Sequence, residues 1–255
     1  MWFDEAKKLI SQVEGDIGFL VKNLKTGETF SHNSDMVFPS ASTIKVYVLL
    51  ALADEAAAKR MDMNEVLPSS PGNVGGCGII DYLSDKLPFT LRDYAVFMIT
   101  ISDNAATNIL ITAIGLETIN ANIQSLGAKD TVLGRKLMDF EAMKLGKQNL
   151  TTCEDLLKAF AHMQNDTEKY ADVLKILGHQ QLQEMLPAYI PGIGEKVIFP
   201  HKTGELSGVR HDVGIMYVND EPIFICFLSK GLKCNVDGVR LANDLGFMVY
   251  NHFKG

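Results

Sequence analysis

The sequence predicts an α+β protein: an antiparallel five-stranded sheet with flanking terminal helices, beside an all-helical lobe. Strand-like segments occur near both ends of the 255-residue chain, whereas apolar residues at helical spacing dominate its middle. No internal repeat or low-complexity linker divides the chain. Strands from the two ends are therefore expected to pair with each other around a helical insertion.

Each end of the chain contributes one helix and part of the sheet. An apolar run at 17–21, a turn at 25–27 and a second strand predict an N-terminal hairpin. Three further strands are expected within 196–205, 211–220 and 221–231, followed by a closing helix over 237–253. An amphipathic helix precedes the hairpin, with one apolar side formed by Trp2, Phe3, Ala6, Leu9, Ile10 and Val13.

Threonine caps support the helices of the middle. Thr90 precedes Asp93 as in a capping box, and Thr151 and Thr152 precede acidic residues. Residues 1–41 and 187–255 are predicted to form the α/β lobe and 42–186 the helical lobe, with the active site in the cleft between them. The expected helices cover 43–60, 90–101, 104–114, 116–126, 152–163 and 171–177.

Composition excludes several classes of function. The net charge is −7, from 24 basic and 31 acidic residues without a basic stripe, which argues against nucleic acid as a partner. The apolar stretch Val46–Ala53 is too short to cross a bilayer. We expect a monomer that acts on a small molecule. The cysteines Cys77, Cys153, Cys226 and Cys234 show no metal-ligand spacing and indicate neither a metal nor a disulfide framework, and Cys226 is expected in the core.

The N-terminus shows no signal peptide, because a basic region, an apolar run and a small-residue cleavage site are missing. As written, the chain is expected in the cytoplasm. If it has been trimmed to a mature form, a secreted or periplasmic location is expected instead.

The segment FPSASTIK places Ser42 and Lys45 three residues apart at a helix start, and therefore on one helix face. A serine needs a base to become a nucleophile, and a lysine can serve if burial or nearby positive charge keeps it neutral. The free N–H of Ser42 could stabilise an oxyanion. A helix cap followed by a surface lysine explains this short motif equally well.

Two further short motifs could complete a site. Ser102 of SDN could relay a proton, and Asn104 could bind a substrate carbonyl and Lys45, although the three residues also suit an interhelical turn. Lys202 of KTG could lower the pKa of Lys45 by like-charge repulsion, although a strand that ends in a turn explains KTG as well. Thr203 could bind an anionic group, Gly204 would let a substrate approach, and the Glu205 backbone could supply a second oxyanion donor.

The three motifs occur in the order SxxK, SDN and KTG, with 60 residues from Ser42 to Ser102 and 100 from Ser102 to Lys202. In this combination the chain resembles the serine penicillin-recognising enzymes, most closely class A β-lactamases, over nearly its whole length. The resemblance implies the β-lactamase/transpeptidase-like fold, no metal and no cofactor. It implies that Ser42 is the acylated nucleophile and Lys45 its base. It further implies that Ser102 relays a proton and that Asn104 contacts the acyl amide of the substrate. Lys202, Thr203 and Gly204 would form the strand edge that holds the substrate carboxylate.

One family feature is missing. Class A enzymes release the acyl group with a glutamate in an E-P-x-x-N motif, and the segment 134–152 contains no such motif. A gapless match places Leu137 at the glutamate position, and Leu150 at the aspartate that would pair with Arg135. Asp139 and Glu141 are the remaining carboxylates near by. Glu141, at the position of the motif's asparagine, is the candidate base, although both could equally face solvent.

Arg210 and His211 follow KTG on the next strand, and one of them could bind the substrate carboxylate. His211 matches the family's arginine position but could also be a buried strand residue. The glycines Gly72, Gly75, Gly76 and Gly78 suggest a mobile loop near the cleft rather than a phosphate-binding loop.

The leading hypothesis is therefore a serine hydrolase that opens the β-lactam amide through a Ser42 acyl-enzyme. A D-alanyl-D-alanine peptidase or an esterase on the same scaffold is the first alternative. A β-lactam-acylated binding protein that does not turn over is the second.

Overall fold

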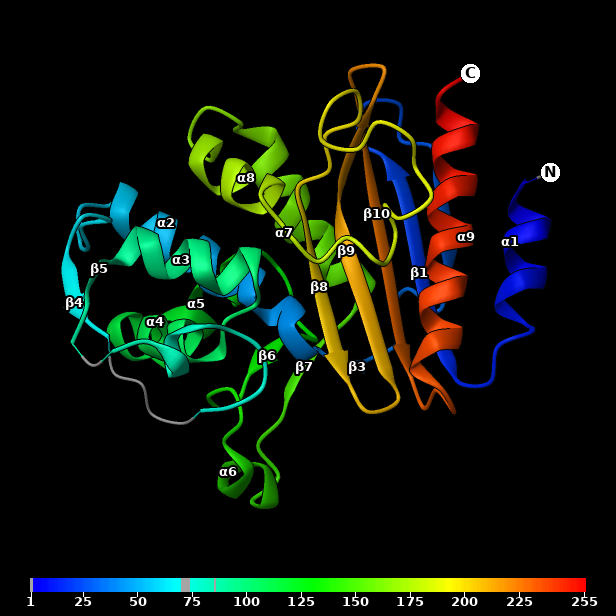
Figure 1. Ribbon diagram of the computed structural model, residues 1–255. Coiled ribbons are helices and arrows are strands. Elements are labelled where there is room, and N and C mark those ends of the chain that lie inside the picture. Colours follow the sequence, from blue (N-terminus) through cyan, green and yellow to red (C-terminus); the bar gives the residue numbers. More distant parts are fainter. Residues whose placement is uncertain (1, 70–73, 85) are drawn as a thin grey trace.

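The main sheet is built from both ends of the chain in a computed structural model that describes residues 2–69, 74–84 and 86–255 (Figure 1). Its five strands pair antiparallel in the order β2-β1-β10-β9-β8. The predicted α+β class and five-stranded antiparallel sheet are thus confirmed. The strands are β1 (Asp16–Asn23), β2 (Thr29–His32), β8 (His201–Leu206), β9 (Val209–Val218) and β10 (Glu221–Lys230).

The sheet separates two apolar cores, and strand β10 contributes to both. Alternate side chains of a strand point to opposite faces, so a strand buried on both sides is apolar at consecutive positions. Phe224, Cys226 and Leu228 lie in the core shared with the helical elements. Ile223, Ile225 and Phe227 lie in the core beneath the terminal helices. The prediction that Cys226 is a core residue is confirmed.

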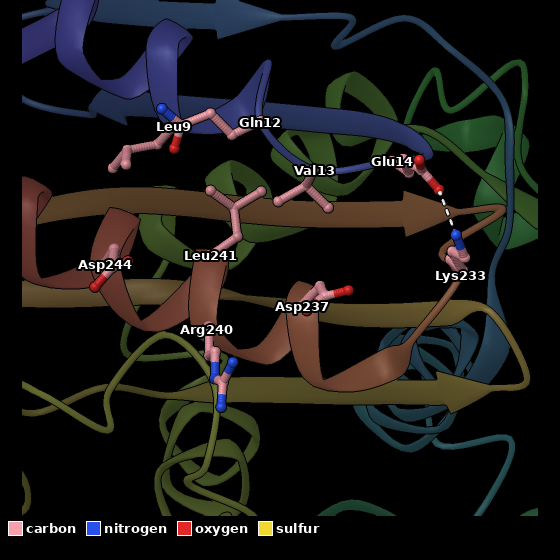
Figure 2. Close-up of a pocket in the computed structure, with 9 residues that line it drawn as sticks. All are labelled: Leu9, Gln12, Val13, Glu14, Lys233, Asp237, Arg240, Leu241 and Asp244. Carbon is pink, nitrogen blue, oxygen red and sulfur yellow. Dashed lines mark ion pairs between the residues drawn. The ribbon is translucent and has the colours of Figure 1, made fainter.

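The terminal helices α1 (Trp2–Ile10) and α9 (Asn235–Phe253) lie together on one face of the sheet (Figure 1). Helix α1 ends before Val13, because residues 11–13 form tight backbone turns back onto it. A groove lies between the two helices, with Leu9, Val13 and Leu241 among its lining residues. Glu14 and Lys233 form an ion pair across one end of it, with 3.7 Å between Oε2 and Nζ (Figure 2).

The helical elements cover the opposite face of the sheet and surround helix α2, whose first eight residues are all buried. Thr90 and Thr152 both accept a hydrogen bond from a backbone N–H in the first turn of the helix they precede. The helix α6 was not expected from sequence. The helices are α2 (Lys45–Ala57), α3 (Leu91–Thr100), α4 (Asn104–Ile114), α5 (Leu116–Ser125), α6 (Phe140–Lys144), α7 (Cys153–Asn165) and α8 (Ala171–Gly178).

Two small sheets were also missed, because strands of two or three residues leave no periodicity to detect. The pairs are β4 (Val66–Pro68) with β5 (Pro88–Thr90), and β3 (Phe38–Pro39) with β7 (Asn149–Thr151) and β6 (Val132–Leu133). Residues 196–200 do not belong to β8, which begins directly after Pro200. The lobe boundaries at 41/42 and 186/187 stay a prediction. In the described part of the chain, no helix combines the length and the hydropathy of a membrane span.

Candidate active site

Ser42 lies in a short 3₁₀ helix, Ala41–Ile44, that leads directly into α2, so that Lys45 is the first residue of α2. The backbone of Ala41 takes a left-handed conformation, with φ of 45°, and strain of this kind persists only where the surroundings hold it. Strand β8 lies directly against this residue: a Cβ at Gly204 would be only 3.2 Å from Ala41 Cβ. Glycine at this position therefore allows β8 to lie against the serine.

Two buried lysines meet at Ser102. The Nζ of Lys45 donates to Ser102 O at 2.7 Å, to Ser102 Oγ at 3.0 Å and to Asn104 Oδ1 at 2.9 Å. From β8, Lys202 donates its Nζ to the same Ser102 Oγ at 3.1 Å and to Thr203 O at 3.0 Å. Ser102 itself has a φ of 57°, a second left-handed residue in the site. The structure thus joins SxxK, SDN and KTG around one hydroxyl.

Burial changes the acid–base chemistry of both lysines. Loss of hydration lowers the pKa of Lys45 well below its ordinary value, and the charge of Lys202 lowers it further. Burial also lowers the pKa of Lys202, to about 8. Burial contributes more to the lowering than the like-charge repulsion expected from sequence. A lysine in this environment gives up its proton more readily and can act as a base.

Asp103, the middle residue of SDN, fixes the turn. Its Oδ1 caps α4 by accepting from Ala106 N, and its Oδ2 accepts from the backbone N–H groups of Ile79 and Ile80. A Cβ at Gly78 would collide with this carboxylate, and one at Gly76 would collide with the Asn104 amide. Gly76 and Gly78 therefore let their loop lie against SDN, whereas a Cβ at Gly75 would meet no neighbouring atom. Gly72 lies outside the described residues.

A pocket connects these elements, and several of its residues were not singled out from sequence. Cys77 is an exposed free thiol on the glycine loop, while Leu182, Glu184 and Met185 follow α8. Asn243 of α9 holds the latter segment by donating to the carbonyls of Glu184 and Met185. Among the described residues, no three potential metal ligands cluster. The pocket is lined by Ser42, Cys77, Ser102, Leu182, Glu184, Met185, Thr203, Gly204, Glu205, Arg210 and His211.

Arg210 and His211 both line this pocket, but their environments differ. His211 is buried, with Nε2 2.7 Å from Pro39 O and Nδ1 2.8 Å from Arg210 O, and burial lowers its pKa to about 4. It is therefore neutral near pH 7 and links β9 to β3. Arg210 keeps its charge, and its Nη1 lies 2.7 Å from Glu205 Oε2. Of the two candidates, only Arg210 offers a cation to a substrate.

Within the loop from 134 to 152, Leu137 is held by hydrogen bonds to its backbone. The side-chain amide of Asn108 on α4 donates to Leu137 O at 3.0 Å and accepts from Leu137 N at 2.8 Å. The Leu137 side chain is partly buried against the core of the helical elements. Met138 then turns the chain with a left-handed φ of 60°. An apolar side chain thus occupies the position that the sequence comparison assigned to the deacylating glutamate.

Neither carboxylate of this loop lines the pocket. Glu141 lies on α6, which projects away from the rest of the molecule (Figure 1), with 82% of its side chain exposed. Its Oε1 forms an ion pair with Lys144 Nζ at 2.8 Å. Asp139 caps α6 by accepting from Ala142 N. The structure therefore does not bring Glu141 to Ser42, which corrects its assignment as the catalytic base.

Asn149 joins the two ends of the loop 134–152. Its Oδ1 accepts from the backbone N–H groups of Gly134 and Arg135, and its Nδ2 donates to Arg135 O. None of the ion pairs found among the described residues involves Arg135, and Leu150 instead pairs with Pro39 and Val132 in the small sheet. The neutral amide of Asn149 thus joins the two ends of this loop, where the family uses an arginine–aspartate pair that the sequence already shows to be missing.

Comparison with solved structures shows the same fold elsewhere. A β-lactamase from Sphaerobacter thermophilus superposes with a TM-score of 0.89 and 27% identity, covering 99% of this chain and 96% of that one. PBP-A superposes with a TM-score of 0.88 and 26% identity, over 99% of this chain and 96% of its own. One PBP-A structure is the acyl-enzyme complex of a leucine-to-glutamate mutant with penicillin G.

Sequence comparison agrees. The β-lactamase CARB-4 of Pseudomonas aeruginosa is 29% identical over 154 residues, and SME-1 of Serratia marcescens is 28% identical over 133 residues. These matches cover 58% and 51% of this chain, which spans about half the length of the curated relatives it matches. The family model described as "Beta-lactamase enzyme family" matches residues 3–253. The chain therefore belongs to the beta-lactamase enzyme family.

Proposed function

We propose that the protein is a serine hydrolase of the class A β-lactamase type that opens the β-lactam amide through an acyl-enzyme on Ser42. The convergence of Lys45 and Lys202 on Ser102 Oγ, in the pocket that contains Ser42, carries this proposal. A nucleophile, a lysine with a lowered pKa and a hydroxyl relay are the parts that acylation requires.

In the proposed acylation, neutral Lys45 takes the proton of Ser42 Oγ, which attacks the lactam carbonyl. The backbone N–H groups of Ser42 and Glu205 bind the oxyanion, and Gly204 leaves room for the substrate beside them. Ser102 Oγ gives its proton to the departing nitrogen as the lactam C–N bond breaks, and Lys45, whose Nζ lies 3.0 Å away, passes the proton taken from Ser42 on to Ser102 and becomes neutral again. Lys202 and Thr203 hold the substrate carboxylate, while Asn104 positions the acyl amide.

Deacylation is proposed to be slow. Water must be activated to hydrolyse the ester on Ser42, and this usually requires a positioned base. Leu137 cannot supply one, and both Asp139 and Glu141 are engaged in the protruding part of the loop. The base remains unassigned, and the acyl-enzyme is expected to accumulate.

A D-alanyl-D-alanine peptidase or esterase on the same scaffold is the second candidate, and the leucine at position 137 favours it. Such an enzyme releases a peptide or ester acyl group without needing rapid β-lactam hydrolysis. Release of D-alanine from an acyl-D-alanyl-D-alanine peptide, measured beside nitrocefin hydrolysis, distinguishes the two activities.

A nitrocefin progress curve at micromolar enzyme tests the leading proposal. We expect a burst of about one equivalent, followed by slow continuous turnover. The site contains the groups that acylation needs, whereas neither carboxylate of the loop 134–152 lines the pocket to serve deacylation. A burst followed by complete arrest contradicts a β-lactamase and favours the acylated binding protein.

The nucleophile is tested separately with Ser42→Ala. This variant should lose all covalent labelling by a fluorescent penicillin, because the proposed acyl-enzyme forms on the Ser42 hydroxyl and the other serine of the pocket, Ser102, is held by Lys45 and Lys202 as the proton relay. Circular dichroism shows whether the variant still folds. Labelling of folded Ser42→Ala protein contradicts the assignment.

A further inference from the structure

Three charged residues, Glu184, Glu205 and Arg210, line the Ser42 pocket together, and we call them the charged rim. Arg210 Nη1 lies 2.7 Å from Glu205 Oε2 and 3.7 Å from Glu184 Oε1. The two carboxylates come from different parts of the chain, one from β8 and the other from the segment after α8. Both carboxylates are thus brought to Arg210, the one arginine among the described residues that line the pocket.

The arginine is held, whereas the carboxylates are open. Only 17% of the Arg210 side chain is exposed, and its stem packs over Gly238 of α9, where a Cβ would lie 3.3 Å from Arg210 Cβ. The exposed fractions of the Glu184 and Glu205 side chains are 47% and 52%. Each carboxylate can therefore accept further hydrogen bonds from a ligand.

The rim carries one positive and two negative charges. Deeper in the site, Lys202 is fully buried and already donates to Ser102 Oγ and Thr203 O. His211 of β9, which also lines the pocket, is neutral near pH 7 because burial lowers its pKa to about 4. A substrate carboxylate that approaches Lys202 and Thr203 thus meets net negative charge at the rim, and Arg210 must leave Glu205 to bind it.

We propose that the charged rim makes the enzyme prefer substrates whose leaving group carries a positive charge close to its carboxylate. Such zwitterionic groups place the carboxylate at Lys202 and Thr203 and the cation against the solvent-exposed sides of the Glu184 and Glu205 carboxylates, which Arg210 leaves open. Substrates whose leaving group carries the carboxylate alone are acylated more slowly. This specificity rests on the proposed acylation of Ser42 and names the substrate class for it.

Two cephalosporins with the same acylamino side chain test the rim. One carries a neutral acetoxymethyl group at C3, and the other a cationic pyridiniummethyl group, beside the same ring carboxylate. The measured quantity is the ratio of their second-order acylation rate constants, cationic over neutral. At partly exposed carboxylates, removal of one charge by Glu184→Gln or Glu205→Gln should lower this ratio about threefold to tenfold.

Glu14→Gln is the matched control, because it removes the same charge from the groove between α1 and α9 (Figure 2), which shares no lining residue with the Ser42 pocket. Its ratio should equal that of the wild type. Unchanged ratios in both rim variants overturn the inference, and so does an equal drop in Glu14→Gln, which would indicate net charge alone. Failure of both cephalosporins to acylate the wild type instead overturns the proposed function together with this specificity.

Discussion

The pocket around Ser42 and the loop from 134 to 152 use polar side chains in different ways. In the pocket, side chains bond to one another, as Lys45 and Lys202 do at Ser102 Oγ. At the loop, the amides of Asn149 and of Asn108 on α4 bond to backbone groups, and no residue of 134–152 lines the Ser42 pocket. The first arrangement can transfer protons, whereas the second fixes the path of the loop backbone. Acylation and deacylation should therefore respond separately to mutation.

The largest effect is expected from Leu137→Glu. The Asn108 side chain bonds to the backbone N–H and carbonyl of Leu137. The loop should therefore keep its path when the side chain at position 137 is replaced. A carboxylate there could activate water, and deacylation should accelerate by about 100-fold, the usual contribution of a general base. Release of fluorescent penicilloyl label from the purified acyl-enzyme measures this rate.

Leu137→Gln is the matched control, because it adds a polar group of the same size that cannot take a proton. Glu141→Gln should leave the deacylation rate unchanged, since Glu141 faces solvent and pairs with Lys144. Faster release in Leu137→Gln would show that the gain does not come from a base at position 137, and slower release in Glu141→Gln would show that Glu141 takes part in deacylation after all.

The next largest effect is a fall in acylation at alkaline pH. Lys202 must be protonated to hold a substrate carboxylate, and burial lowers its pKa to about 8. Above that pH, kcat/KM should fall by up to about tenfold per pH unit. On the acid side, kcat/KM should fall as Lys45 becomes protonated and can no longer act as base. The pH profile of nitrocefin acylation measures both limbs.

Lys202→Arg provides the comparison, because a guanidinium stays protonated throughout this range. The alkaline fall should disappear in this variant. An alkaline fall that remains near pH 8 assigns it to another group and contradicts the role of Lys202.

The sequence predicted most of the pocket and little of the loop, for physical reasons. SxxK and SDN lie where helices begin and KTG lies within β8, so the pattern of apolar residues places all three. Strand alternation explains why β8 delivers Lys202 to the helical side. Glu184 and Cys77 carry no such signal. They reach the pocket because Asn243 holds one segment and glycines allow the other to lie against Asp103.

The loop could be predicted only by what it lacks. The missing glutamate and the missing partner of Arg135 were readable in the sequence, whereas the helix α6 and its exposed Glu141 were not. A five-residue helix shows too little periodicity to detect. The path of the loop depends on single amide contacts far apart in sequence, such as that between Asn108 and Leu137. The sequence therefore offers Glu141 as a base, whereas the structure places its side chain in solvent beside Lys144.

The smallest effect on chemistry is expected from Asn149→Ala, which removes all three side-chain contacts at the base of the loop. Unpaired backbone donors cost about 1–3 kcal/mol, so local opening should become more frequent and proteolysis within 134–148 about tenfold faster. Acylation by fluorescent penicillin should keep its wild-type rate, because the Asn149 carbonyl still accepts from Ser40 N beside the nucleophile. Asn149→Asp retains the acceptor for Gly134 and Arg135 and should be cleaved at an intermediate rate. A parallel loss of acylation in Asn149→Ala would show that the loop and the pocket form one unit, against the separation argued above.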